Sequence, residues 1–155
     1  MSIVKSLSVG NGDMFYIKHN TDNFTIIDCN ITGTDANKKS IVDELIRESS
    51  SKTLTRFIST HPDGDHFGGI EYLDSRMPIV NFYSVKNQAT KSTETNDFKK
   101  YCALRDSGKA FNIYEGCTRK WMNIGDEARS HAGIHSLWPK TSNQYYIDAF
   151  KIANE

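Results

Sequence analysis

Four side chains of the types that bind metal ions lie within a stretch of six residues. They are His61, Asp63, Asp65 and His66, and they follow an apolar, strand-like segment at residues 54–60. In an extended segment, residues 61, 63 and 65 share one side, while a turn at 65–66 lets neighbouring side chains diverge toward a second centre. The spacing therefore indicates a loop that serves two metal ions about 3.5–4 Å apart, in which Asp65 binds one ion and orients the attacking water.

Imidazole and carboxylate together suit zinc, with iron or manganese as alternatives. Gly64, Gly68 and Gly69 permit turns and close approaches that a residue with a Cβ would resist. The competing interpretation is a polar, glycine-rich turn in which Asp and His only cap backbone groups. Downstream, His131 or His135 would complete the site if the chain folded back over the loop. The simpler expectation is that His131 lies in a turn and His135 in a strand.

The elements that would position this loop alternate between strands and helices. Two short β-rich runs flank Asn11-Gly12, a pair typical of a tight hairpin turn. Apolar residues at helical spacing predict a helix that begins after Thr34 or Asp35 as N-cap and ends at Ser49 to Ser51. The segments predicted as strands are 3–9, 14–17, 24–29, 54–60, 79–84, 111–114 and 134–138, with further helices from Gly68 and from Thr95, Asn96 or Asp97. This alternation predicts a layered α/β (α+β) domain.

Composition predicts a globular protein. The 155 residues are 37% hydrophobic and 25% charged, which favours a single domain with its own core over disorder. The formal net charge is zero, so charge does not indicate a nucleic-acid surface. Three cysteines at spacings unlike a zinc pair, and no secretory signal, predict a reducing, cytoplasmic setting. No apolar run reaches the roughly 20 residues that span a bilayer, so no membrane association is expected.

Several further side chains are assigned from their local context. Asp13 and Asp28 are expected to brace the hairpin and the loop by hydrogen bonds, with support of the metal ligands as the alternative. His19, in a polar turn, is expected at the surface. Trp121 and Trp138 are expected to anchor the core or an interface.

The stretch from residue 60 to residue 69, called here the candidate metal loop, resembles that of the metallo-β-lactamase superfamily. That family's pattern is H-x-H-x-D-H followed by Gly-Gly at the start of a helix, and the similarity extends loosely over residues 3–75. The branch it most resembles is the DNA-uptake (ComEC-like) metallo-hydrolases. The resemblance implies imidazole ligands from His61 and His66 and an aspartate ligand from Asp65. Asp63 stands where the family usually has histidine, and is interpreted as a changed ligand.

The resemblance also implies a fold and an activity. The fold would be the N-terminal half, with additions, of an αββα sandwich, forming one domain over residues 1–155 that is truncated at its C-terminus, because no later His-His-Gly segment follows. The activity would be hydrolysis of an ester or phosphodiester, in a small molecule or a nucleic acid, through a metal-bound hydroxide. The alternative is a non-catalytic half-domain that binds a partner chain or self-associates. Whether this chain alone forms a complete site stays open.

Overall fold

The computed structural model describes residues 2–128 and 130–154, and the chain divides into two compact units. Unit 1 comprises Met1–Ser84 and Lys91–Phe111, and unit 2 comprises Val85–Thr90 and Asn112–Glu155. A single domain over residues 1–155 stays a prediction. The described residues contain five helices and one six-stranded mixed sheet, which confirms the mixed α/β class.

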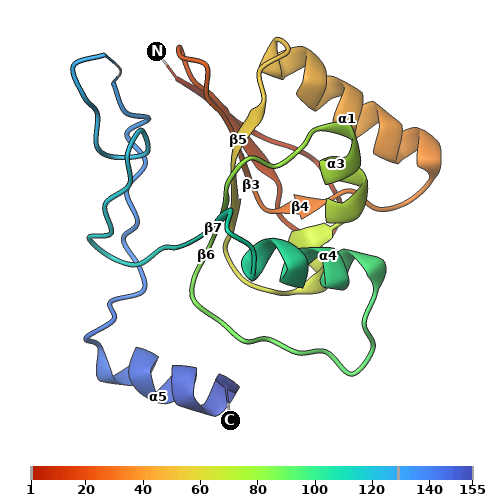
Figure 1. Ribbon diagram of the computed structural model, residues 1–155. Helices are drawn as coiled ribbons and strands as arrows, with labels where there is room; N and C mark the ends of the chain where they lie inside the picture. The colour runs from red at the N-terminus through yellow and green to blue at the C-terminus, as the bar shows by residue number, and fades with distance from the viewer. Residues whose placement is uncertain (1, 129, 155) are drawn as a thin grey trace. The chain divides into compact units, whose positions relative to one another are not determined.

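The sheet has the strand order β1-β2-β3-β5-β6-β7 (Figure 1). Strands β1, β2 and β3 pair antiparallel, as the predicted hairpin requires, whereas β3, β5 and β6 pair parallel. The parallel part needs crossover connections, and helices supply them. The strands are β1 (Ile3–Ser6), β2 (Phe15–Lys18), β3 (Phe24–Ile27), β5 (Leu54–Ser59), β6 (Phe82–Ser84) and β7 (Ala110–Asn112), with a two-residue β4 (Cys29–Asn30) beyond β3.

Helices α1, α3 and α4 lie on one face of this sheet (Figure 1). The helices are α1 (Asp35–Ser49), α2 (Gly64–Phe67), α3 (Ile70–Arg76), α4 (Asn96–Arg105) and α5 (Gln144–Asn154). Thr34 caps α1 by accepting a hydrogen bond from the amide of Asn37, and Thr95 caps α4 by accepting one from Phe98. Both caps are among those that the sequence predicted, because a hydroxyl before an apolar-periodic run satisfies an otherwise unpaired amide.

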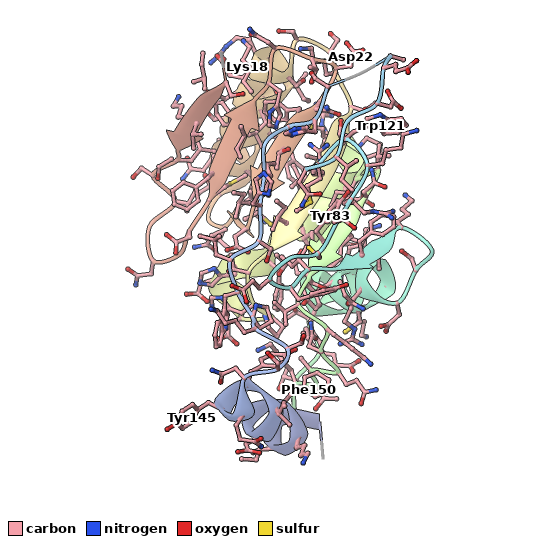
Figure 2. The ribbon with its side chains drawn as sticks, turned by 90° about the vertical axis from the view of Figure 1, so that its left-hand side faces the viewer. Lys18, Asp22, Tyr83, Trp121, Tyr145 and Phe150 are labelled. Carbon is pink, nitrogen blue, oxygen red and sulfur yellow. The ribbon has the colours of Figure 1, made fainter. Side chains whose placement is uncertain are left out.

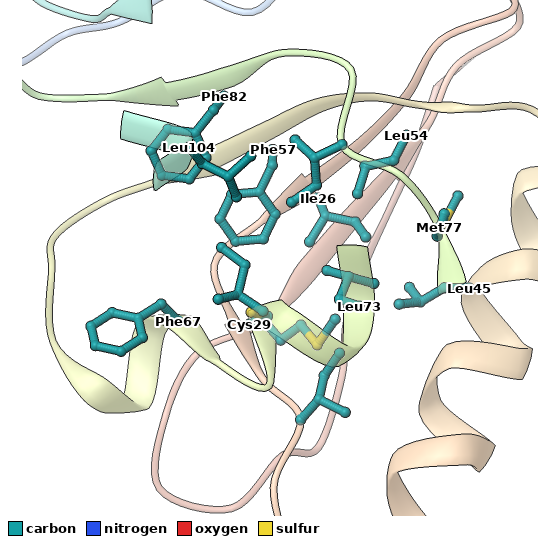
Figure 3. Packing of buried hydrophobic residues seen from close by; sticks show 14 of the residues in the cluster. Ile26, Cys29, Leu45, Leu54, Phe57, Phe67, Leu73, Met77, Phe82 and Leu104 are labelled. Atoms are coloured by element: carbon teal, nitrogen blue, oxygen red, sulfur yellow. The ribbon is translucent and has the colours of Figure 1, made fainter. Parts of the chain in front are cut away.

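The core of unit 1 lies between the sheet and these helices (Figure 3). Ile26, Phe57 and Phe82 come from the three parallel strands and are fully buried. The rings of Phe57 and Phe82 stack with their centroids 5.7 Å apart, and Leu45 of α1 and Leu73 of α3 belong to the same buried cluster. This packing fixes the register of β3, β5 and β6, so it also fixes where their carboxyl ends emerge.

The other face of the sheet carries a buried polar group. Thr25 pairs with Arg56 across β3 and β5, and Arg56 Nη1 donates a hydrogen bond of 3.2 Å to Thr25 Oγ1. His19 Nε2 lies 3.1 Å from the same oxygen, and His19 is only 4% exposed, so the prediction of a surface histidine is wrong. Burial, together with the positive charges of Arg56 and Lys52, lowers the pKa of His19 to about 4. The polar turn before β3 folds against the sheet, which local sequence did not reveal.

His19 should make the stability of the protein depend on pH. Because its folded pKa of about 4 lies below the ordinary 6.5, its neutral form stabilises the fold fully above pH 6.5, and this contribution declines as the pH falls toward 4. Between pH 7 and pH 4.5 the free energy of unfolding of the wild type should fall by about 2 kcal/mol more than that of His19→Gln. Urea unfolding of both proteins at the two pH values measures this difference, and equal losses would contradict it.

The C-terminal part of the chain differs from the sequence-based expectations. Residues 134–138, predicted as a strand, form no regular element, because this segment makes isolated backbone hydrogen bonds, such as Ile134 N to Met122 O at 3.1 Å, instead of a ladder. Helix α5 was not predicted. Trp121 and Trp138 are 38% and 55% exposed, so neither is a core residue.

Within the described residues, no helix combines the length and the apolar character that crossing a membrane requires.

Candidate metal-binding loop

The candidate metal loop emerges beside Asp28 at the carboxyl ends of two neighbouring parallel strands. β3 ends at Ile27 and β5 at Ser59, and Ile27 pairs with Ile58. In open α/β sheets, ligands bind outside the carboxyl ends of the strands. The loop therefore lies where this architecture usually places a site.

Asp28 ties the beginning of the loop to the end of β3. Its Oδ1 accepts a hydrogen bond of 2.8 Å from the amide of Thr60, and its Oδ2 accepts one of 2.6 Å from the Thr60 hydroxyl. Asp28 is 1% exposed and has a φ of +52°, a left-handed conformation that costs a residue with a Cβ roughly 1–3 kcal/mol. Strain of this size persists where surrounding contacts hold it, and these hydrogen bonds do so. The expected bracing of the loop by Asp28 is confirmed.

His66 is oriented by the same carboxylate. Its Nδ1 lies 3.0 Å from Asp28 Oδ2, and its side chain is only 11% exposed. An ionised carboxylate only accepts hydrogen bonds, so in the neutral imidazole Nδ1 carries the proton and Nε2 presents a lone pair. A carboxylate that holds one ring nitrogen while the other binds a metal is a recurrent arrangement in metal sites. The Nε2 atom of His66 lies 3.7 Å from Asp65 Oδ2.

His61 is oriented through Thr60. The Thr60 hydroxyl uses its one proton on Asp28, so toward His61 Nδ1, 2.9 Å away, its oxygen is the acceptor. His61 Nε2 is thereby also left with a lone pair, 3.7 Å from Asp63 Oδ2. The centroids of the His61 and His66 rings are 3.7 Å apart. One hydrogen-bonded chain through Asp28 and Thr60 thus sets the tautomer of both histidines.

The two carboxylates of the loop are open to solvent. The side chains of Asp63 and Asp65 are 63% and 51% exposed. Lys91 balances part of their charge, because its Nζ lies 3.3 Å from Asp63 Oδ1. Among the residues that the structure describes, no group of three or more His, Cys, Asp or Glu side chains is arranged so that it could hold a metal ion. The side chains are of the types that bind zinc, and they lie in two pairs, His61 with Asp63 and His66 with Asp65.

His131 and His135 lie in unit 2, with their ring centroids 6.4 Å apart. The candidate metal loop lies in unit 1, and the two units are not placed relative to each other. Completion of the site by either histidine stays a prediction.

Glycines allow the loop to pack closely on its neighbours. A Cβ on Gly12, in the β1–β2 turn, would lie 2.5 Å from the carbonyl oxygen of Asp65, and a Cβ on Gly69 would lie 2.4 Å from that of Ile31. Gly68 is also crowded, whereas a Cβ on Gly64 would meet no atom within 4 Å. Close packing therefore requires glycine at two of the three predicted positions, Gly68 and Gly69, but not at Gly64. Gly12 was predicted only as part of a turn.

Two further residues that lie outside the candidate metal loop help to position it, and the sequence of the loop itself does not reveal them. The carboxylate of Asp97, in the first turn of α4, accepts hydrogen bonds from the amides of Gly69 and Glu71, at 2.8 and 3.1 Å. Asn30 donates through Nδ2 to the carbonyl of Asn11, at 2.7 Å, and so holds the β1–β2 turn. Asp97 was recognised only as one of three possible helix caps.

In comparisons with known proteins, no family model and no curated protein matches the chain.

Proposed function

We propose that this chain binds divalent metal ions through His61, Asp63, Asp65 and His66 and acts as a metal-dependent hydrolase of an ester or phosphodiester bond. The observation that carries the proposal is the orientation of the two histidines, whose Nε2 atoms each lie 3.7 Å from a carboxylate oxygen of the loop. Two imidazoles with two carboxylates form a donor set for zinc, and iron or manganese are the alternatives.

The fold supports the same proposal. A sheet with helices on one face and the loop at its carboxyl edge is what the first half of a metallo-β-lactamase-like αββα sandwich would provide. We propose that unit 1 is such a half. A phosphodiester is the favoured substrate on the resemblance of the loop to the DNA-uptake branch, which is an argument by analogy.

The roles of the side chains follow from their surroundings. Bound metal ions would supply Lewis-acid stabilisation of developing negative charge and would activate water at neutral pH. His61 and His66 would hold the ions, and the buried Asp28 would keep both rings in the binding tautomer. Asp63 and Asp65 would hold the ions from the solvent side, where a substrate has access. Lys91, which lies at Asp63, would compete with an ion for that carboxylate.

Zinc titration of the metal-free chain tests this proposal. We expect zinc binding with up to two ions per chain, and a zinc affinity about 10–100-fold lower in Asp28→Asn, because partners that orient metal ligands typically contribute that much. Asp13→Asn is the matched control, since Asp13 lies in the β1–β2 turn and outside the hydrogen bonds to the histidines. Circular dichroism of each variant separates lost affinity from lost structure.

The variant His61→Ala/His66→Ala sets the background for nonspecific zinc. A wild-type chain that binds no more zinc than this variant would overturn the proposal. The non-catalytic half-domain would then be the remaining hypothesis. A chain that binds zinc and yet does not hydrolyse bis-p-nitrophenyl phosphate or a p-nitrophenyl ester would retain the metal site and lose the hydrolase assignment.

A further inference from the structure

Unit 2 contains a cavity of about 410 Å³ that belongs to none of the features described above. Its apolar wall consists of Ile113 and Tyr114, which follow β7, and of Tyr146, Ile147 and Phe150 on α5. Pockets of roughly 300–1,000 Å³ with mostly apolar and aromatic linings are typical of small-molecule sites. The size and the lining of this cavity are those of a ligand site.

Helix α5 presents one face to the cavity. Tyr146, Ile147 and Phe150 are spaced so that they share a side of the helix, and the rings of Tyr146 and Phe150 are 5.9 Å apart. All three are partly buried, whereas Tyr145 is 86% exposed. Figure 2 shows Tyr145 and Phe150 leaving α5 in different directions. The apolar face of α5 is thus directed into the cavity and is incompletely covered.

The polar part of the lining is positively charged. Lys86 and Lys151 line the cavity together with Asn112 and Thr141, and none of the described lining residues is acidic. Both lysines are exposed. An occupant with an apolar body would find its charge complement in an anionic group placed near these ammonium groups.

We propose that this cavity binds a small amphiphilic anion, with an aliphatic or aromatic body against α5 and a carboxylate or similar group near Lys86 and Lys151. A second copy of the chain is the less suitable occupant. In a two-fold dimer the same patch meets itself, which would bring the lysines of both copies together without an acidic partner from the lining. The proposal does not depend on metal binding, because all the lining residues belong to unit 2.

Titration calorimetry of the full chain with decanoate, below its micellar concentration, tests the proposal. We expect saturable binding of one decanoate, weaker binding of octanoate by about fourfold for each methylene removed, and weaker binding of decanol. The variant Lys86→Gln/Lys151→Gln should bind decanoate about fivefold more weakly and decanol unchanged, since each exposed ion pair contributes modestly. Lys38→Gln/Lys99→Gln removes the same charge from helices of unit 1 and should bind decanoate as the wild type does.

Ile147→Trp, which fills the cavity, should abolish binding, and Asn112→Trp fills it from the opposite segment if the first variant does not fold. Equal affinities for decanoate, decanol and decyltrimethylammonium would overturn the anionic specificity. No saturable binding, or binding unchanged in both tryptophan variants, would overturn the site. Self-association that is lost in Ile147→Trp while decanoate does not bind would assign the face to a contact between copies and overturn the proposal as well.

Discussion

Replacing Asp65 by alanine is expected to abolish hydrolysis of bis-p-nitrophenyl phosphate, with a loss of more than about 100-fold in rate and in zinc affinity. Removal of a partner that only orients a metal ligand already costs about 10–100-fold, and Asp65 is proposed to contact the ion itself. The side chain is 51% exposed, and its neighbour in the loop is His66 Nε2 at 3.7 Å. Stability should therefore change by less than about 0.5 kcal/mol.

Steady-state rates with added zinc, manganese or iron measure this effect, and urea unfolding shows that the fold is intact. Asp35→Ala is the matched control, because Asp35 is a fully exposed aspartate in the first turn of α1 and has no contact with the loop. It removes the same charge from the same unit. Hydrolysis by Asp65→Ala at the rate of Asp35→Ala would show that any activity of the chain resides elsewhere.

The features that the sequence predicted well are those determined by neighbouring residues. α1 and its cap Thr34 follow from apolar residues at helical spacing behind a hydroxyl. The candidate metal loop was recognised because its four donors are almost contiguous, so no knowledge of the fold was needed to bring them together. The structure adds the part that proximity in sequence cannot give, the hydrogen bonds of Asp28 across 32 and 38 residues to Thr60 and His66.

The features that were missed depend on contacts between distant segments. From the sequence, His19 was assigned to an exposed turn. In the structure it is buried beside Thr25, which also contacts Arg56, and the pairing of β3 with β5 brings Thr25 and Arg56 together. Helix α5, by contrast, had a local signal. Asn143 accepts a hydrogen bond from the amide of Tyr146, and apolar residues at helical spacing follow, so a search for caps would have found the helix.

Gly69→Ala should destabilise unit 1 by about 2–5 kcal/mol, because two costs add at this position. Gly69 has a φ of +78°, which costs a residue with a Cβ roughly 1–2 kcal/mol. The added Cβ would also lie 2.4 Å from the carbonyl oxygen of Ile31 and 2.7 Å from its Cβ, and overpacking a tight site typically costs about 1–3 kcal/mol. Urea unfolding followed by far-ultraviolet circular dichroism measures the loss.

The backbone around Gly69 has little freedom to relieve this clash. The Gly69 amide is bound by Asp97, its carbonyl accepts a hydrogen bond of 2.9 Å from Leu73 N, and Ile31 N donates one of 2.7 Å to Gly68 O. Gly64→Ala is the matched control in the same loop, since its Cβ would meet no atom within 4 Å and α2 would gain a better helix former. That variant should be as stable as the wild type or more stable by up to about 1 kcal/mol. Equal stability of the two alanine variants would mean that the close contact between Ile31, which follows β4, and Gly69 at the start of α3 does not hold the loop. The positioning of His66 by the fold would then lose its basis.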